Sequence, residues 1–105
     1  MSDKVVRDGK VAVLVSPEYG AGWSTWADHK EAAVFAPEVV AWVEAGKPRD
    51  VYLENEERWE MEFGYVGGME DLEVEWLERG TRFEIEEYDG SESLRILTPT
   101  DGYVA

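Results

Sequence analysis

Five consecutive apolar residues, Val11 to Val15, place the strongest constraint on how this chain can fold. A strand with one wet face alternates apolar and polar side chains, whereas a strand buried on both faces is apolar throughout. We therefore predict a strand over residues 10–15 that is buried on both faces. A chain of 105 residues builds one small core, and we expect a single domain over residues 1–105 that is organised around this strand.

The predicted strand runs directly into a loop that is rich in glycine and tryptophan. Glycine lets backbone N–H groups approach a bound group closely, and tryptophan offers a flat face for stacking. We therefore predict that the loop binds a ligand, through Tyr19, Gly20, Gly22, Trp23, Ser24, Thr25 and Trp26. Tyr65, from a second glycine-rich loop over residues 64–68, is predicted to join them. The alternative is that Trp23 and Trp26 are core residues and the glycines serve a tight turn. Neither the glycine spacing of a dinucleotide motif nor the lysine of a P-loop is present.

The charge of the chain limits its partners. Acidic residues outnumber basic ones by 24 to 10, which gives a formal net charge of −14. Such a charge repels the phosphates of nucleic acids, so direct DNA or RNA binding is disfavoured, and it attracts basic proteins. Solubility alone explains the same composition equally well.

The sequence offers little to catalysis or metal binding. It contains no cysteine and one histidine, His29, so disulfides, thiolate ligands and cysteine nucleophiles are excluded. No pair of carboxylates can be singled out for acid–base chemistry. We expect no metal and no cofactor, and the balance favours a protein that is not an enzyme.

No apolar run approaches the roughly 18 residues that a membrane-spanning helix needs. The first residues also lack a hydrophobic signal region. We therefore expect a cytoplasmic protein without a membrane partner, and a homo-oligomer stays open.

Turn and helix signals organise the first half of the chain. The dipeptide Asp8-Gly9 predicts a hairpin between residues 4–7 and 10–15. The spacing of Asp28 and Glu31 matches a capping box and predicts a short helix over residues 29–34.

A second helix is predicted over Pro37–Ala45. Proline is favoured at the first helical position and glycine just past the end, where Gly46 stands. Trp42 is the largest residue on its apolar stripe and is predicted to lie in the core. Residues 51–63 fit a helical face only partly; we predict a helix there, although the sequence leaves the conformation of residues 48–68 open.

Residues 72–98 alternate apolar and polar side chains, as antiparallel strands with one buried face do. Arg79-Gly80 and Asp89-Gly90 interrupt the alternation, and Asp-Gly is a signal for a two-residue turn. We predict a three-stranded meander in one sheet with residues 10–15. Its predicted pairs are Val74 with Ile85, Trp76 with Phe83, Phe83 with Ile96, Ile85 with Leu94, and Tyr88 with Ser91. This register buries Leu94 and Ile96 and exposes Arg95.

The same register gathers four glutamates on the other face, namely Glu73, Glu75, Glu84 and Glu86. It sets Glu75 opposite Glu84 and Glu73 opposite Glu86. Like charges directly opposite one another destabilise a sheet by roughly 0.2–1 kcal/mol per pair. Such a stripe is either a solvated face or a surface that is kept for a basic partner.

Several motifs carry a resemblance that covers most of the chain. The residues are Tyr19-Gly20-Ala21-Gly22-Trp23-Ser24-Thr25-Trp26, Gly67-Gly68, Val74-Glu75-Trp76 and Ile85-Glu86-Glu87-Tyr88-Asp89-Gly90. With these motifs the chain resembles a group of small uncharacterised proteins of phages and their bacterial hosts. The resemblance implies a phage accessory protein in the host cytoplasm, and by analogy one that counters host defence. It brings no activity with it.

We therefore predict an α+β fold, in which a small antiparallel sheet is covered by one or two helices. Two functions stay open for a protein of this kind. The first is a binder of a small, nucleotide-derived defence signal, which it sequesters at the glycine and tryptophan loop. The second is an acidic nucleic-acid mimic, whose glutamate face occupies a basic site on a host defence protein.

Overall fold

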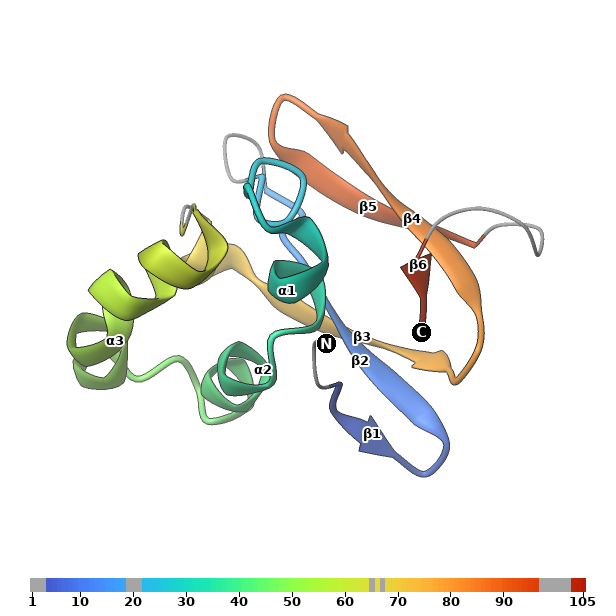
Figure 1. The fold of residues 1–105 in the computed structure, drawn as a ribbon, viewed down its shortest axis with the longest axis horizontal. Coiled ribbons are helices and arrows are strands. Elements are labelled where there is room, and N and C mark those ends of the chain that lie inside the picture. Colours follow the sequence, from blue (N-terminus) through green and yellow to red (C-terminus); the bar gives the residue numbers. More distant parts are fainter. Residues whose placement is uncertain (1–3, 19–21, 65, 67, 97–102) are drawn as a thin grey trace.

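Strand β2 (Lys10–Val15) runs through the middle of the computed structural model (Figure 1), whose described residues are 4–18, 22–64, 66, 68–96 and 103–105. Every side chain from Val11 to Val15 is at most 5% exposed. The prediction of a strand that is buried on both faces is confirmed. Two antiparallel sheets and the helices make an α+β fold, as expected.

The first sheet has the strand order β1-β2-β3, with β1 at Val6–Arg7 and β3 at Glu73–Glu78. The predicted hairpin between β1 and β2 is confirmed, because Val6 pairs with Val11. Its turn residues, Asp8 and Gly9, have φ of 51° and 77°. Both values lie in the left-handed region, which a tight hairpin turn of this type requires.

The second sheet has the order β5-β4-β6, with β4 at Arg82–Tyr88, β5 at Ser91–Ile96 and β6 at Tyr103–Val104. The predicted register between β4 and β5 is confirmed, with the pairs Phe83–Ile96, Ile85–Leu94 and Tyr88–Ser91. The turn at Asp89-Gly90 adopts positive φ at both residues. A local turn signal thus fixed this hairpin correctly.

The predicted meander is wrong at its first strand, because β3 pairs with β2 and not with β4. Trp76 lies opposite Ala12 rather than Phe83, and Val74 lies opposite Leu14 rather than Ile85. The physical reason is that β2 is buried on both faces and needs backbone partners on both edges. Strand β1 pairs with only two residues of β2, whereas β3 pairs with β2 along the whole length of β2.

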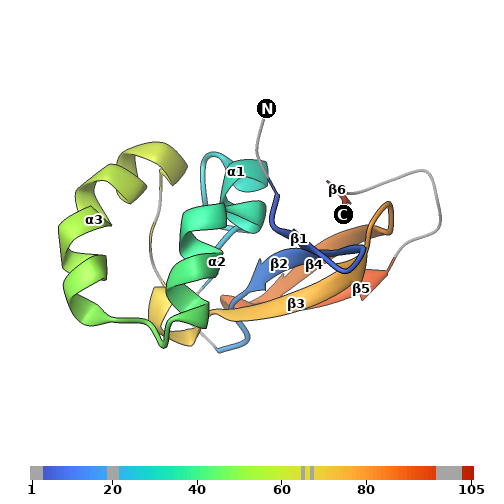
Figure 2. The same ribbon diagram turned by 90° about the horizontal axis from the view of Figure 1, so that it is seen from below.

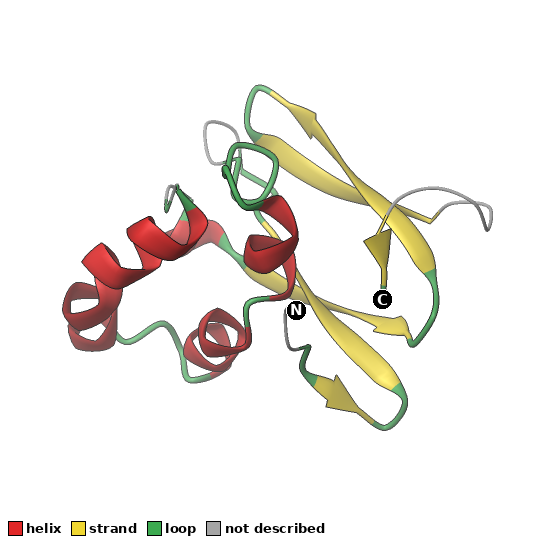
Figure 3. Ribbon diagram, in the orientation of Figure 1, coloured by secondary structure: helices red, strands yellow, loops and turns green. Residues whose placement is uncertain are grey.

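The helices gather on one side of the first sheet (Figure 3). They are α1 (Lys30–Phe35), α2 (Pro37–Glu44) and α3 (Arg49–Phe63), followed by a 3-10 turn at Met69–Asp71. All three predicted helices are therefore present, with Pro37 at the start of α2. Figure 2 shows α2 lying against β2 and β3, with α3 on its outer side.

The expected capping box at Asp28 does not form. Helix α1 begins one residue later than predicted, and its N-cap residue, His29, makes no side-chain capping bond. Instead, the backbone N–H groups of Asp28 and His29 both donate to the carbonyl oxygen of Phe63, at 3.0 and 3.1 Å. The end of α3 thus fixes the start of α1.

Strand β2 separates two cores. The first core contains Ala12 and Leu14 on one face of β2, together with buried side chains of the helices, among them Trp42 as predicted. The second core contains Val11, Val13 and Val15 on the other face, and it is closed by Phe83 and other residues of the second sheet. Helix α1 contributes to both cores, with Ala33 in the first and Val34 and Phe35 in the second.

The predicted burial of β5 is only partly right. Arg95 is exposed as predicted, and Leu94 packs half-buried against the second core. Ile96 shares the inward side of β5 with Leu94, yet it is 55% exposed. It lies at the end of the strand, where the described part of the second core does not reach it.

Candidate binding surface at Trp26

The loop after β2 is tied to the turn of the β4–β5 hairpin, far along the chain. Among the described residues, the N–H of Gly22 donates to the carbonyl of Gly90 at 2.6 Å, and the N–H of Glu92 donates to the carbonyl of Ser16 at 2.7 Å. The Ser91 hydroxyl donates to the carbonyl of Pro17 at 2.6 Å. The loop and the hairpin turn therefore form one unit.

A buried carboxylate, Glu92, completes this attachment. It is 2% exposed and accepts three hydrogen bonds: from the Ser16 N–H at 3.1 Å, the Thr25 N–H at 2.9 Å and the Thr25 hydroxyl at 2.7 Å. Hydrogen bonds of this kind offset the cost of burying a carboxylate. Glu92 thus fixes both ends of the loop to β5.

Sequence reasoning missed Glu92, although a signal was present. The turn at Asp89-Gly90 places position 92 on the same side of β5 as Leu94 and Ile96. A charged residue at an inward position of a strand needs hydrogen-bonding partners in the interior. That conflict marks Glu92 as a residue that holds another segment.

Trp23 belongs to the first core. It is fully buried, its indole N–H donates to the carbonyl of Ala33 at 2.9 Å, and its ring meets that of Phe63 edge-on at 5.5 Å. The next residue in the chain, Ser24, is also buried. Neither side chain presents a surface on which a ligand could stack.

Trp26 lies at the surface of the same loop and is 42% exposed. Its indole N–H donates to Glu87 Oε1 at 3.1 Å. Its ring packs over Gly22, where φ is +59° and a Cβ atom would collide with the indole. We call Gly22, Trp26 and Glu87 the Trp26 platform: a glycine seat, an exposed ring and a carboxylate at the ring's edge.

Hydrogen bonds favour the charged form of Glu87. Its Oε2 accepts the N–H of Gly90 at 3.0 Å while Oε1 accepts the indole N–H of Trp26. These bonds, the Gly90 bond first, hold the pKa of the Glu87 carboxyl below its usual range. The platform therefore carries a full negative charge at neutral pH.

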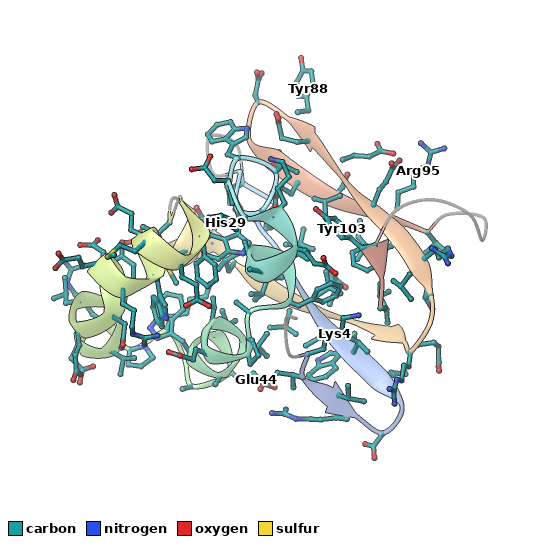
Figure 4. The ribbon with its side chains drawn as sticks, in the orientation of Figure 1. Lys4, His29, Glu44, Tyr88, Arg95 and Tyr103 are labelled. Atoms are coloured by element: carbon teal, nitrogen blue, oxygen red, sulfur yellow. The ribbon has the colours of Figure 1, made fainter. Side chains whose placement is uncertain are left out.

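The surroundings of the platform add both aromatic and acidic groups. Tyr88 and Asp89 follow Glu87 on the hairpin and are exposed, and Tyr88 is 71% exposed and points away from the body of the protein (Figure 4). Lys30 follows the loop in the chain, and its ammonium donates to the carbonyls of Thr25 and Ala27 at 2.6 and 3.1 Å. It stabilises the turn that carries Trp26.

The loop residues predicted to bind a ligand therefore divide into three groups. Gly22, Trp23 and Ser24 are buried, Thr25 is half-buried against Glu92, and Trp26 is exposed. Tyr19, Gly20 and Tyr65 lie outside the described residues.

The predicted acidic stripe is not present as one surface. Glu75 lies opposite Val13 and Glu73 opposite Val15 in the first sheet. In the second sheet, Glu84 lies opposite Arg95 and Glu86 opposite Ser93. The predicted opposition of like charges is thus wrong, and its reason is the pairing of β3 with β2.

Arg95 also neutralises part of the second-sheet face. Its guanidinium lies 3.3 Å from the Glu84 carboxylate and 3.2 Å from that of Glu86. Exposed pairs like these are worth little to stability, yet they lower the negative charge that this face offers to a partner.

Within the part of the chain that the structure describes, no group of three or more histidine, aspartate or glutamate side chains could hold a metal ion. None of the described helices is both long enough and apolar enough to cross a membrane. Comparison with protein-family models, with curated proteins and with solved structures found no match for this chain.

Proposed function

We propose that this protein is a non-enzymatic binding protein that docks, through the Trp26 platform and the carboxylates around it, on a basic surface of another protein. The observation that carries the proposal is the way in which the exposed Trp26 ring is held in place. A solvent-facing tryptophan is here fixed by a glycine that admits its ring and by a carboxylate that holds its edge. A ring that is already ordered loses little entropy on binding, and tryptophan is enriched among the residues that dominate interface energies.

The charge of the surface supports a basic partner over a nucleotide. A phosphate group that stacked at Trp26 would lie beside the Glu87 carboxylate, and the exposed Asp89 follows on the same hairpin. Repulsion of this kind costs affinity, whereas the same carboxylates attract and orient a cationic surface. This favours the protein-partner hypothesis over the sequestration of a nucleotide-derived signal.

The surface field is acidic because acidic residues outnumber basic ones by 24 to 10, and some of the arginines are paired with glutamates of the protein itself. Arg7 pairs with Glu44 at 2.6 Å, and Arg58 pairs with Glu38 at 2.6 Å. Each of these pairs is neutral as a whole, so the field comes from the net charge of −14, which favours fast encounter with a positively charged partner at low salt. The resemblance to small phage proteins extends the proposal to a nucleic-acid-binding host defence protein; that extension rests on the resemblance alone.

The test is a displacement assay. A short fluorescein-labelled DNA duplex is bound to each of a panel of basic bacterial DNA-binding proteins, and this protein is titrated in. We expect displacement from at least one of them, and we expect Trp26→Ala to weaken it by roughly tenfold or more, the effect of losing a central interface tryptophan.

Leu53→Ala is the matched control, because Leu53 is an exposed apolar residue on α3, a different element from the loop. It should leave displacement unchanged. Displacement that Trp26→Ala leaves intact would refute the proposal, as would a failure to displace DNA from any protein of the panel.

A further inference from the structure

The two components of the Trp26 platform match the two needs of an arginine side chain. The face of an indole attracts a cation, and a carboxylate accepts hydrogen bonds from a guanidinium. Each oxygen of Glu87 already accepts one hydrogen bond, from Trp26 and from Gly90. A carboxylate has about four acceptor positions, so Glu87 can hold the indole and receive a cation at the same time.

The hydrogen bond from Trp26 to Glu87 also strengthens the ring as a cation receptor. An N–H that donates to a carboxylate leaves more electron density on the indole. Glu87, like any exposed glutamate, is ionised at neutral pH, and its hydrogen bonds lower its pKa further. The charge that orients the cation is therefore in place at neutral pH.

The protein itself contains a guanidinium that contacts an indole and a carboxylate together. The Arg7 guanidinium carbon lies 5.3 Å from the centre of the Trp76 ring, and its two terminal nitrogens donate to Glu44 at 2.6 and 2.8 Å. One guanidinium thus binds an indole and a carboxylate together on this protein's surface. Trp26 and Glu87 offer the same two kinds of group on the loop and the hairpin, here joined by a hydrogen bond of their own.

We propose that Trp26 and Glu87 form a receptor for the guanidinium group of an arginine on the partner protein. This inference rests on the proposed function and names the group that the Trp26 platform recognises. Arginine is preferred to lysine because its planar guanidinium stacks on an indole, is weakly hydrated and presents several N–H donors at once. At an exposed site, contact with the indole does not offset the cost of removing water from a strongly hydrated lysine ammonium.

The test compares two peptide probes of equal charge, hexa-arginine and hexa-lysine. Binding is followed by NMR at the indole N–H resonance of Trp26, which is assigned by its absence from the Trp26→Ala spectrum. We expect the arginine peptide to bind about fivefold more tightly than the lysine peptide, in line with a modest cation–π advantage at an exposed site.

Two variants and one control make the result specific. Trp26→Ala, followed by calorimetry, should reduce the ratio of the two affinities to about one, and so should Glu87→Gln, which keeps the size of the side chain. Glu78→Gln removes the same charge from an exposed position on β3. It should weaken both peptides equally and leave the ratio unchanged.

The outcomes separate this inference from the proposed function. Equal affinities with a shift of the Trp26 resonance would refute the preference for guanidinium and leave the Trp26 platform as a general cation surface. A ratio that survives Trp26→Ala would also refute the inference. Binding of either peptide that leaves the Trp26 resonance unmoved would contradict both the inference and the proposed function.

Discussion

Glu92→Ala takes three hydrogen bonds out of the protein interior at once. The donors are the N–H of Ser16 and both the N–H and the hydroxyl of Thr25. A hydrogen bond to a charged group contributes about 1.5–3 kcal/mol, and a buried donor that loses its acceptor costs about 1–3 kcal/mol. The loss therefore exceeds that of an ordinary surface substitution several times over.

Two effects reduce this loss of stability. The variant no longer has to bury a carboxylate, which costs several kcal/mol in the parent protein, and water can enter the vacated space and satisfy part of the donors. We expect the free energy of unfolding to fall by about 3 kcal/mol, which is a large share of the roughly 5–15 kcal/mol that stabilises a typical protein. Glu92→Gln should cost about 2 kcal/mol, because an amide offers one acceptor oxygen where the carboxylate offers two.

Urea denaturation followed by circular dichroism measures these changes. Ser93→Ala is the matched control, because Ser93 is the next residue on β5 and is exposed; it should change stability by no more than about 0.5 kcal/mol. Amide exchange at Ser16 and Thr25 should also become faster in Glu92→Ala. A loss below about 1 kcal/mol with unchanged exchange would show that Glu92 does not hold the loop.

Three further predictions concern other parts of the molecule. Trp42→Ala should lower the free energy of unfolding by roughly 3–5 kcal/mol in urea denaturation, since a buried aromatic leaves a cavity; a change below about 1 kcal/mol would contradict its place in the first core. Gly22→Ala should displace the Trp26 ring, because its Cβ collides with the indole, and a red-shifted fluorescence relative to the parent would report it; an unchanged spectrum would contradict the packing. The Glu56 carboxylate accepts the Tyr52 hydroxyl and raises the pKa of that phenol to about 12, so the stability from this bond is complete below pH 10 and is lost as the pH rises towards 12. Ultraviolet titration of phenolate should detect the late ionisation, and Glu56→Gln should lower that pKa; a Tyr52 that titrates near 10 in the parent would contradict the contact.

Local signals in the sequence predicted local structure well. The two Asp-Gly dipeptides fixed both hairpins, because a two-residue turn and strict alternation together allow only one register. Pro37 and Gly46 marked the ends of α2 in the same way, to within two residues. In each case the deciding information lies within about ten residues of chain.

The partner of β3 could not be predicted by the same reasoning. The alternation in Glu73–Glu78 fits pairing with β4 and pairing with β2 equally well, because both place Val74 and Trp76 on an apolar face. What decides is the need of β2 for a second strand along its edge, about 60 residues away in the chain. Neither segment carries that information by itself.

The candidate site was predicted as a loop but not as a surface. Trp23 and Trp26 are three residues apart and have the same chemistry, yet one is core and the other is exposed. The difference comes from α1 and α3, whose Ala33 carbonyl and Phe63 ring receive Trp23. The sequence left open whether the two tryptophans lie in the core or line a binding loop, and the fold buries Trp23 and exposes Trp26.

Strand β2 has a consequence for how the protein unfolds. Its odd-numbered valines, such as Val13, and its even-numbered residues, such as Leu14, belong to different cores on opposite faces of the same backbone. Neither core can survive the departure of this strand, so no stable half of the molecule remains to be populated. We expect one cooperative transition, with the amides of β2 exchanging only through global unfolding. Strands β2 and β3 pair although most of the chain lies between them. Pairing over such a large sequence separation should make folding slow for so small a protein.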